Sequence, residues 1–295
     1  MSTSTKPLAA LAVPLLVAGC TFAPATIKPV PEPPPAPAAA APTTPAPVEP
    51  PPAAVKLNPD ALTPSFTALA QQIPGQVGVA IFDGNDTMSF GTWSTGPAWS
   101  TIKVPLAIAA ARHDLTTSAP LIERAITASD NAAADQLWAF LGEPAAAAAA
   151  VNQVLVDGAN PDVQVQADQI RPPYSPYGQT IWSQADAARF AWALPCIPDA
   201  ELVLAQMHNI TPDQQWGLAA TDNTAAKGGW GPDPDGNYLA RQIGIIHTET
   251  GTLGVAIATT PDDGTFTTAT ALLNSLANWV TKNTTGFPAQ QCAEG

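Results

Sequence analysis

A serine and a lysine near residue 100 have the types and spacing that nucleophilic chemistry needs. Ser100 and Lys103 stand three positions apart at the start of a segment with helical periodicity. Side chains at this spacing share one face of a helix, so we expect the Lys103 amine to approach the Ser100 hydroxyl. A serine hydroxyl needs an adjacent base to attack a carbonyl, and lysine is a base only where burial or a second cation favours its neutral form. The pair predicts a nucleophile and its base.

Two further motifs follow in the chain, and they supply the groups that such a nucleophile lacks. Residues 129–131 read Ser-Asp-Asn, and residues 227–229 read Lys-Gly-Gly. Chance gives roughly 0.02 occurrences of Ser-Asp-Asn in a chain of this composition, against roughly 0.2 for the Ser-x-x-Lys pair, so the second motif is the more specific signal. Lys227 is a candidate for the second cation, and the backbone N–H of Ser100 at a helix start would face a developing oxyanion.

The elements that must position these motifs form two groups. Apolar alternation predicts strands at residues 77–82 and 88–93, joined by a turn at 83–85. Helical periodicity then predicts helices at residues 101–113, 121–128, 131–141, 144–155, 184–192 and 200–207. Further strands are predicted at residues 224–229, 239–247 and 253–259, followed by a helix at 267–280. This order predicts an α+β domain in which both ends of the chain build one antiparallel sheet beside a helical subdomain.

The three motifs, in this order, resemble the signature of class A β-lactamases and related penicillin-binding proteins, which is S-x-x-K, S-D-N and K-T/S-G. The resemblance extends through residues 99–107 and 125–135 and covers essentially all of residues 60–285. It implies a β-lactamase/penicillin-binding-protein-like fold. It also implies a serine acyl-enzyme hydrolase that acts on β-lactams or peptidoglycan-like peptides.

The resemblance also implies a role for each site residue. Ser100 would be the acylated nucleophile, Lys103 its base, and Ser129 the group that relays a proton to the leaving nitrogen. Asn131 would bind the substrate amide and Lys227 its carboxylate. The substrate-binding strand would also contribute Gly229 and Trp230, and the backbone N–H groups of Trp230 and Ser100 would form the oxyanion hole.

Two departures from the family pattern bear on turnover. Gly228 stands where the third motif normally has Thr or Ser, so one hydrogen bond to a substrate carboxylate is lost. Residues 166–178 contain no Glu to activate the deacylating water, and Asp168 is their one carboxylate. We therefore expect acylation with poor deacylation. The alternative is a catalytically degenerate lipoprotein that keeps the fold for binding or for a structural role in the cell envelope.

Other side chains receive plainer interpretations. Asp130 is expected to be a structural hydrogen-bond acceptor. Arg241, on the next strand, is expected to form a surface salt bridge, and binding of a carboxylate is the alternative. Trp99 and Trp230 stand beside the motifs and are expected to wall the cleft. No metal or cofactor is expected, because no ligand spacing joins the three histidines, His113, His208 and His247.

Composition excludes some partners. The chain of 295 residues carries 11 Lys and Arg against 24 Asp and Glu, which gives a net charge of −13. Binding of nucleic acid is excluded because it needs clustered cations. With 46% hydrophobic residues the chain can bury a large core. We expect residues 57–295 to form one domain and the protein to be a monomer.

The amino-terminal segments predict export and a tether. Residues 1–20 combine one lysine, a short apolar run and a small-residue stretch that ends at Cys20, a pattern that resembles the lipobox of bacterial lipoproteins. This implies cleavage before Cys20, lipid attachment there, and anchoring at the outer face of the cytoplasmic membrane. Residues 21–56 are rich in proline and alanine and are expected to be an extended spacer. The alternatives are an ordinary signal peptide and a ligand for proline-recognising domains.

The two remaining cysteines form an even pair. Cys196 and Cys292 are expected to form a disulfide in an exported chain, and two unpaired buried thiols are the alternative.

Overall fold

The computed structural model describes residues 58–248, 251–284, 287 and 289–292. The predicted signal peptide, the lipidated Cys20 and the spacer at residues 21–56 lie outside these described residues. All of these residues belong to the second of two compact units, which spans Pro52–Gly295.

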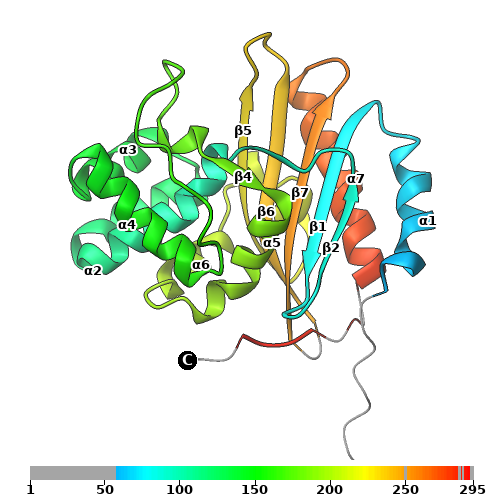
Figure 1. The fold of residues 1–295 in the computed structure, drawn as a ribbon, viewed down its shortest axis with the longest axis horizontal. Coiled ribbons are helices and arrows are strands. Elements are labelled where there is room, and N and C mark those ends of the chain that lie inside the picture. Colours follow the sequence, from blue (N-terminus) through cyan, green and yellow to red (C-terminus); the bar gives the residue numbers. More distant parts are fainter. Residues whose placement is uncertain (1–57, 249–250, 285–286, 288, 293–295) are drawn as a thin grey trace, which may run out of the picture. The chain divides into compact units, whose positions relative to one another are not determined.

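A five-stranded antiparallel sheet forms the centre of the domain (Figure 1). Its strand order is β2-β1-β7-β6-β5, so the first two strands of the chain pair with the last three. The strands are β1 (Gly75–Phe82), β2 (Thr87–Gly91), β5 (Thr224–Pro232), β6 (Tyr238–His247) and β7 (Thr252–Pro261). Val79 of β1 pairs with Ile257 of β7, which joins the two ends of the chain. The predicted sheet is confirmed, and β5 lies at its edge.

Seven helices accompany the sheet in the described part. They are α1 (Pro59–Ala70), α2 (Lys103–Thr127), α3 (Asn131–Phe140), α4 (Pro144–Asp157), α5 (Gln184–Ala193), α6 (Glu201–Met207) and α7 (Phe266–Thr284). The helices predicted at 101–113 and 121–128 belong to one element, α2, whose backbone breaks at Asp114. Among the described helices no single one is long and apolar enough to cross a membrane, although the bent pair α3 and α4 passes the same test of length and composition.

The sequence patterns did not predict one helix, α1, and two short strands, β3 and β4. Helix α1 begins with Pro59 after Asn58, whose side chain accepts the Asp60 N–H at 3.0 Å, but the helix buries only Leu62 and Phe66. Strands β3 (Thr95–Pro97) and β4 (Ile181–Ser183) pair in a separate two-stranded sheet. Three residues are too short for a periodic pattern to appear, so sequence patterning could not find them.

The two faces of the sheet pack against different helices. Along β1, Val79 and Ile81 face the core that includes α1 and α7, whereas Ala80 faces the core that includes α5 and the helical block. A Cβ on Gly254 of β7 would overlap the Ala188 carbonyl of α5, so glycine allows this helix to pack closely. Burial of apolar side chains on both faces stabilises the sheet.

The helical block, α2, α3, α4 and α6, lies beside the edge strand β5 (Figure 1). Nearly every side chain in the first part of α2 is buried, including Lys103. Side chains from α3 and α4, such as Leu137 and Val151, share its core with Ile108 and Ile122 of α2. The start of α2 therefore lies between the sheet and the helices, where the first two motifs are found.

The predicted disulfide is present. Cys196 and Cys292 are bonded, with their Cα atoms 6.0 Å apart. The tail that leads to Cys292 is also held by hydrogen bonds, since Gln290 donates its N–H to the Asp83 carbonyl at 3.0 Å and accepts the Trp192 indole N–H at 3.1 Å.

Candidate active site

The edge strand β5 approaches the start of the helical block very closely. A Cβ on Gly229 would come within 2.8 Å of the Ala98 carbonyl oxygen and of the backbone nitrogens of Ser100 and Thr101. These distances are shorter than real Cβ contacts, so only glycine allows the approach. It brings the segment that contains Trp230 against Ser100, which the predicted oxyanion hole requires.

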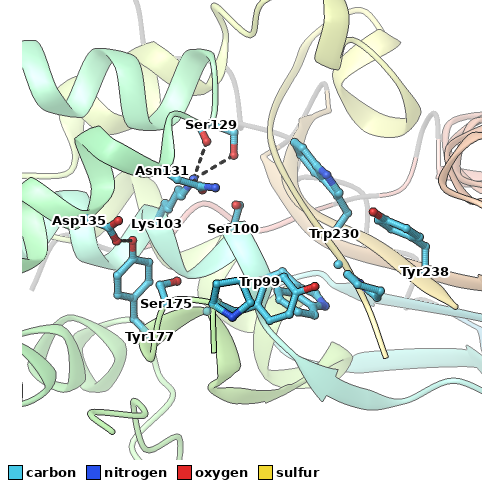
Figure 2. A pocket seen from close by; sticks show the side chains of 15 residues that line it. Trp99, Ser100, Lys103, Ser129, Asn131, Asp135, Ser175, Tyr177, Trp230 and Tyr238 are labelled. Carbon is cyan, nitrogen blue, oxygen red and sulfur yellow. Dashed lines mark hydrogen bonds between the residues drawn. The ribbon is translucent and has the colours of Figure 1, made fainter. Parts of the chain in front are cut away.

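The predicted nucleophile lies on a short 3₁₀ helix, η1 (Trp99–Ile102), which leads directly into α2. Ser100 is half-buried, and Figure 2 shows its hydroxyl in the space between Asn131 and Trp230. No hydrogen bond joins the Ser100 hydroxyl to another group in the described part of the chain. A catalytic hydrogen bond often tightens only when substrate binds, so this geometry is compatible with a nucleophile.

The Lys103 amine is buried and donates hydrogen bonds to three acceptors. It donates to the Ser129 carbonyl at 2.6 Å, to Asn131 Oδ1 at 2.7 Å and to Ser129 Oγ at 3.3 Å. Burial lowers the pKa of Lys103 to about 8, although the nearby carboxylates of Asp135 and Asp130 act in the opposite direction. A lysine with this pKa has a sizeable neutral fraction near neutral pH, which a base for Ser100 needs.

The Ser129 hydroxyl lies between two amines. Lys227, which is fully buried, donates to Ser129 Oγ at 2.8 Å and to the Gly228 carbonyl at 2.8 Å. Burial and the nearby Lys103 lower the pKa of Lys227 well below its usual value. The structure thus brings together Ser129, Lys103 and Lys227, as the sequence predicted. Lys227 lies behind Ser129 and is not among the described residues that line the cleft.

Asp130 has the structural role that the sequence predicted. Its carboxylate caps helix α3 by accepting the Ala133 N–H at 3.1 Å, and it forms an ion pair with Arg124 at 3.0 Å. The hydrogen bond from Ala133 and the Arg124 guanidinium hold the pKa of Asp130 below its usual value. The cap fixes the start of α3 and so positions Asn131, which lines the cleft.

The cleft has a volume of about 380 Å³, and both polar and aromatic side chains line it. Trp99 and Trp230 line it, as predicted, and three tyrosines that the sequence analysis missed line it too: Tyr174, Tyr177 and Tyr238. Figure 2 places Trp230 and Tyr238 on one side of Ser100 and Tyr177 on the other. Their positions depend on the loop at 171–178 and on the turn between β5 and β6, which carry no periodic pattern.

Asp135 is another residue of the cleft that the sequence analysis missed. It lines the cleft and accepts the Tyr177 hydroxyl at 2.6 Å. Burial and this hydrogen bond raise the pKa of Tyr177, so the phenol stays protonated. Asp135 follows Asn131 by four residues on α3, a spacing that places both on one helix face and could have revealed it.

Asp168 does not belong to the cleft. Its side chain is exposed, its backbone N–H donates to Gln166 Oε1 at 3.0 Å, and it is not among the lining residues. In the described cleft no carboxylate comes from residues 166–178, and Asp135 is the one acidic side chain in the lining.

The expectation of a surface salt bridge at Arg241 is wrong. Its side chain is fully buried and donates to the carbonyls of Pro97 and Trp182 at 3.1 Å each and to Gly96 at 3.3 Å. Burial lowers the pKa of Arg241 to about 9. Since Gly96 and Pro97 belong to β3 and Trp182 to β4, the guanidinium ties the two-stranded sheet to β6.

Histidines and acidic residues do not form a metal cluster in the described part of the chain, where no group of three or more His, Cys, Asp or Glu side chains could hold an ion. The fold does bring His208 and His247 together, with ring centroids 6.1 Å apart.

Comparison with known proteins places the fold. No family model and no curated protein matches the sequence. Solved structures do match. A class A β-lactamase from Mycobacterium abscessus is 16% identical with a TM-score of 0.57, and the match covers 75% of this chain and 98% of that one. A β-lactamase from Streptosporangium roseum is 17% identical with a TM-score of 0.57, over 76% and 98% of the two chains. A putative class A β-lactamase from Rhodopseudomonas palustris is 21% identical with a TM-score of 0.54, over 74% and 99%. The chain therefore has the α+β fold of class A β-lactamases, with its helical subdomain, as the sequence predicted.

Proposed function

We propose that this protein is an exported lipoprotein whose β-lactamase-like serine site forms acyl-enzymes with β-lactams or peptidoglycan-like peptides and deacylates slowly. One observation carries the proposal. The Ser129 hydroxyl is hydrogen-bonded to the amines of Lys103 and Lys227, beside a half-buried Ser100. Two lysines buried this close together reduce the stability of the fold, and groups with such perturbed pKa values cluster at catalytic sites.

Acylation follows from this arrangement. The neutral amine of Lys103 takes the Ser100 proton as Ser100 Oγ attacks the substrate carbonyl carbon. The backbone N–H groups of Ser100 and Trp230 then stabilise the oxyanion. Collapse of the intermediate breaks the bond to the leaving nitrogen, which takes the Ser129 hydroxyl proton. Lys103 or Lys227 reprotonates Ser129 through the hydrogen bonds already in place.

Deacylation lacks an equivalent base. Water needs a base within hydrogen-bond reach of the ester, and general-base help typically contributes 10²–10⁴-fold. Asp168 lies outside the cleft, and the Asp135 carboxylate already accepts the Tyr177 hydroxyl. We therefore propose a long-lived acyl-enzyme.

The anchoring part of the proposal is supported by sequence alone. The small residues before Cys20 and the short apolar run favour a lipoprotein at the outer face of the cytoplasmic membrane. The spacer at residues 21–56 would hold the domain away from the lipid.

A binding lipoprotein without turnover is the second candidate. Gly228 in the third motif and the absence of Glu from residues 166–178 favour it. In that case the cleft would hold a ligand without covalent chemistry.

Intact-mass spectrometry after incubation with a β-lactam tests the proposal. We expect a stable mass increase equal to the whole β-lactam, because ring opening loses no atoms, and we expect Ser100→Ala to abolish it. Ser89→Ala, an exposed serine on β2, is the matched control. Absence of an adduct with any β-lactam or acyl-peptide probe would favour the binding lipoprotein, whereas rapid turnover would show that another group activates water.

A further inference from the structure

At Gly228, in the middle of the third motif, the Thr or Ser hydroxyl is absent and the space for it is also filled. A tryptophan ring occupies that space. A Cβ on Gly228 would lie 2.7 and 3.0 Å from two carbons of the Trp216 ring. Such distances leave no room for a Thr or Ser side chain unless the indole moves. Trp216 is nearly fully buried and packs edge-on against Trp230 at 5.8 Å and Phe266 at 6.2 Å, so its ring is held in place.

Among the described residues that line the cleft, no cation is left without hydrogen-bond acceptors for a substrate carboxylate to replace. Lys103 is the one cation among the described residues that line it, and its three N–H groups already have three acceptors. Lys227 is fully buried behind Ser129, and Arg241 is buried against backbone carbonyls. At the rim, Arg171 donates to the Asp233 carbonyl at 2.9 Å and stacks on Tyr174 at 4.8 Å.

Three carboxylates lie in or close to the cleft. Asp135 lines it, and Asp233 and Asp235 lie in the turn that follows β5, next to the lining residue Pro232. Hydrogen bonds from the Asn237 backbone and side chain hold the pKa of Asp233 below its usual value, so this carboxylate is ionised at neutral pH. A substrate carboxylate bound beside Trp230 would lose water without gaining a free cation from the lining, and burial of an unpaired charge is unfavourable.

We propose that the cleft selects acyl donors whose leaving group carries no free carboxylate, and that Trp216 determines this selectivity. The inference rests on the proposed serine acyl-enzyme site and narrows its substrates to internal amides or esters, with an apolar or aromatic group packed against Trp230 and Tyr238. In the reaction, Ser100 Oγ bonds to the acyl carbon, the bond from that carbon to the leaving nitrogen or oxygen breaks, and the leaving atom takes the Ser129 proton.

A pair of probes that differ only in the carboxylate tests this selectivity. The full-length protein in detergent is incubated with benzylpenicillin or with its methyl ester, and the rate of Ser100 adduct formation is followed by intact mass. The reactivity of each probe with hydroxylamine normalises the two rates. We expect the ester to acylate at least ten-fold faster than the acid after this correction.

Substitutions at the contact link the selectivity to Trp216. The double variant Trp216→Ala/Gly228→Thr removes the indole and introduces the hydroxyl of the family motif. We expect it to lower the ratio of the ester acylation rate to the acid acylation rate at least ten-fold. In Gly228→Thr alone, the new side chain still overlaps the Trp216 ring. We therefore do not expect this variant to lower the ester-to-acid ratio of acylation rates. Trp192→Ala, on α5 away from the cleft, is the matched control and should keep the wild-type ratio. Near-ultraviolet circular dichroism checks that each variant is folded.

A fluorophosphonate separates failure of this inference from failure of the proposed function. This small probe labels any activated serine and carries no carboxylate. If it labels Ser100 and the ester is preferred, the inference stands. If it labels Ser100 but the acid reacts as fast as the ester, the inference is overturned and the acyl-enzyme site remains. If neither it nor a penicillin labels Ser100, both are overturned. The wild-type comparison decides the matter even if the double variant does not fold.

Discussion

Lys227 donates a 2.8 Å hydrogen bond to the Ser129 hydroxyl across 98 residues of sequence. Lys227 belongs to the edge strand β5, and Ser129 immediately precedes the helical segment that begins with Asp130 and α3. The bond therefore joins the sheet to the helical block at the point where the cleft lies between them. Since burial shields it from water, it fixes the hydroxyl more firmly than a surface hydrogen bond would.

Acylation should depend on pH through Lys103. Because burial lowers the pKa of Lys103 to about 8, its neutral form increases as pH rises through that value. We expect the rate of adduct formation with a β-lactam to rise between pH 6 and pH 9 and then to level off. Stopped-flow or quench mass measurements over this range test the profile. A flat profile would contradict the assignment of Lys103 as the base.

Asp135 gives an internal test of that assignment. Its carboxylate raises the pKa of Lys103, so Asp135→Asn should lower that pKa and move the rising limb of the profile to lower pH. Asp168→Asn is the matched control, because Asp168 is exposed and lies outside the cleft lining. If both variants shift the pH profile equally, the change in the pKa of Lys103 comes from the net charge of the protein and not from the nearness of Asp135 to Lys103.

Arg241 should contribute strongly to stability. Arg241→Met keeps most of the side-chain volume but leaves the carbonyls of Pro97 and Trp182 without their donor in a buried site. We expect a loss of about 2–4 kcal/mol in the free energy of unfolding, measured by urea titration. Arg189→Met, at a partly exposed ion pair with Asp186, should change it by less than about 1 kcal/mol.

The disulfide should stabilise the domain by constraining its unfolded state. Cys196 and Cys292 are separated by 96 residues, and closure of such a long loop removes much chain entropy. The double variant Cys196→Ser/Cys292→Ser should lose about 2–4 kcal/mol in the free energy of unfolding. Thiol titration under denaturing, non-reducing conditions should find no free thiol at these two positions in the wild type. Two free thiols would refute the bond in the purified protein.

Membrane attachment should depend on Cys20. Cys20→Ser removes the sulfur to which lipid would be attached, so the protein should move from the membrane to the soluble fraction. Fractionation and immunoblotting of cells that express either form measure this. Unchanged fractionation of the serine variant would mean that another feature holds the protein at the membrane.

The sequence predicted that the three motifs meet, because local spacing and motif order define them. Ser100 and Lys103 lie on one helical turn, and the tripeptide at 129–131 is rare enough to be specific. The strands and most helices followed from periodicity. By contrast, the contact between Trp216 and Gly228 depends on the packing of a loop ring over a strand, and no periodic pattern encodes it.

Arg241 shows why burial of a charged residue escapes sequence analysis. All but the terminal residues of β6 are buried on both faces, so the alternation that would mark an inward position is absent. Apart from Gln184 Oε1, the acceptors of its guanidinium are backbone carbonyls up to 145 residues away, and every residue type carries such a carbonyl. The one sequence feature that could have indicated the burial of Arg241 is its position as a charged residue within a continuously apolar strand.

Trp99 and Ser129, which lie on either side of Ser100 in the cleft, both adopt left-handed backbone conformations, with φ of 50° and 53°. Such conformations cost non-glycine residues on the order of 1–3 kcal/mol each, and only the surrounding tertiary packing maintains them. The folded protein thus stores conformational energy in the cleft. We therefore expect heating to relax the backbone around Ser100 at a lower temperature than that at which the sheet melts.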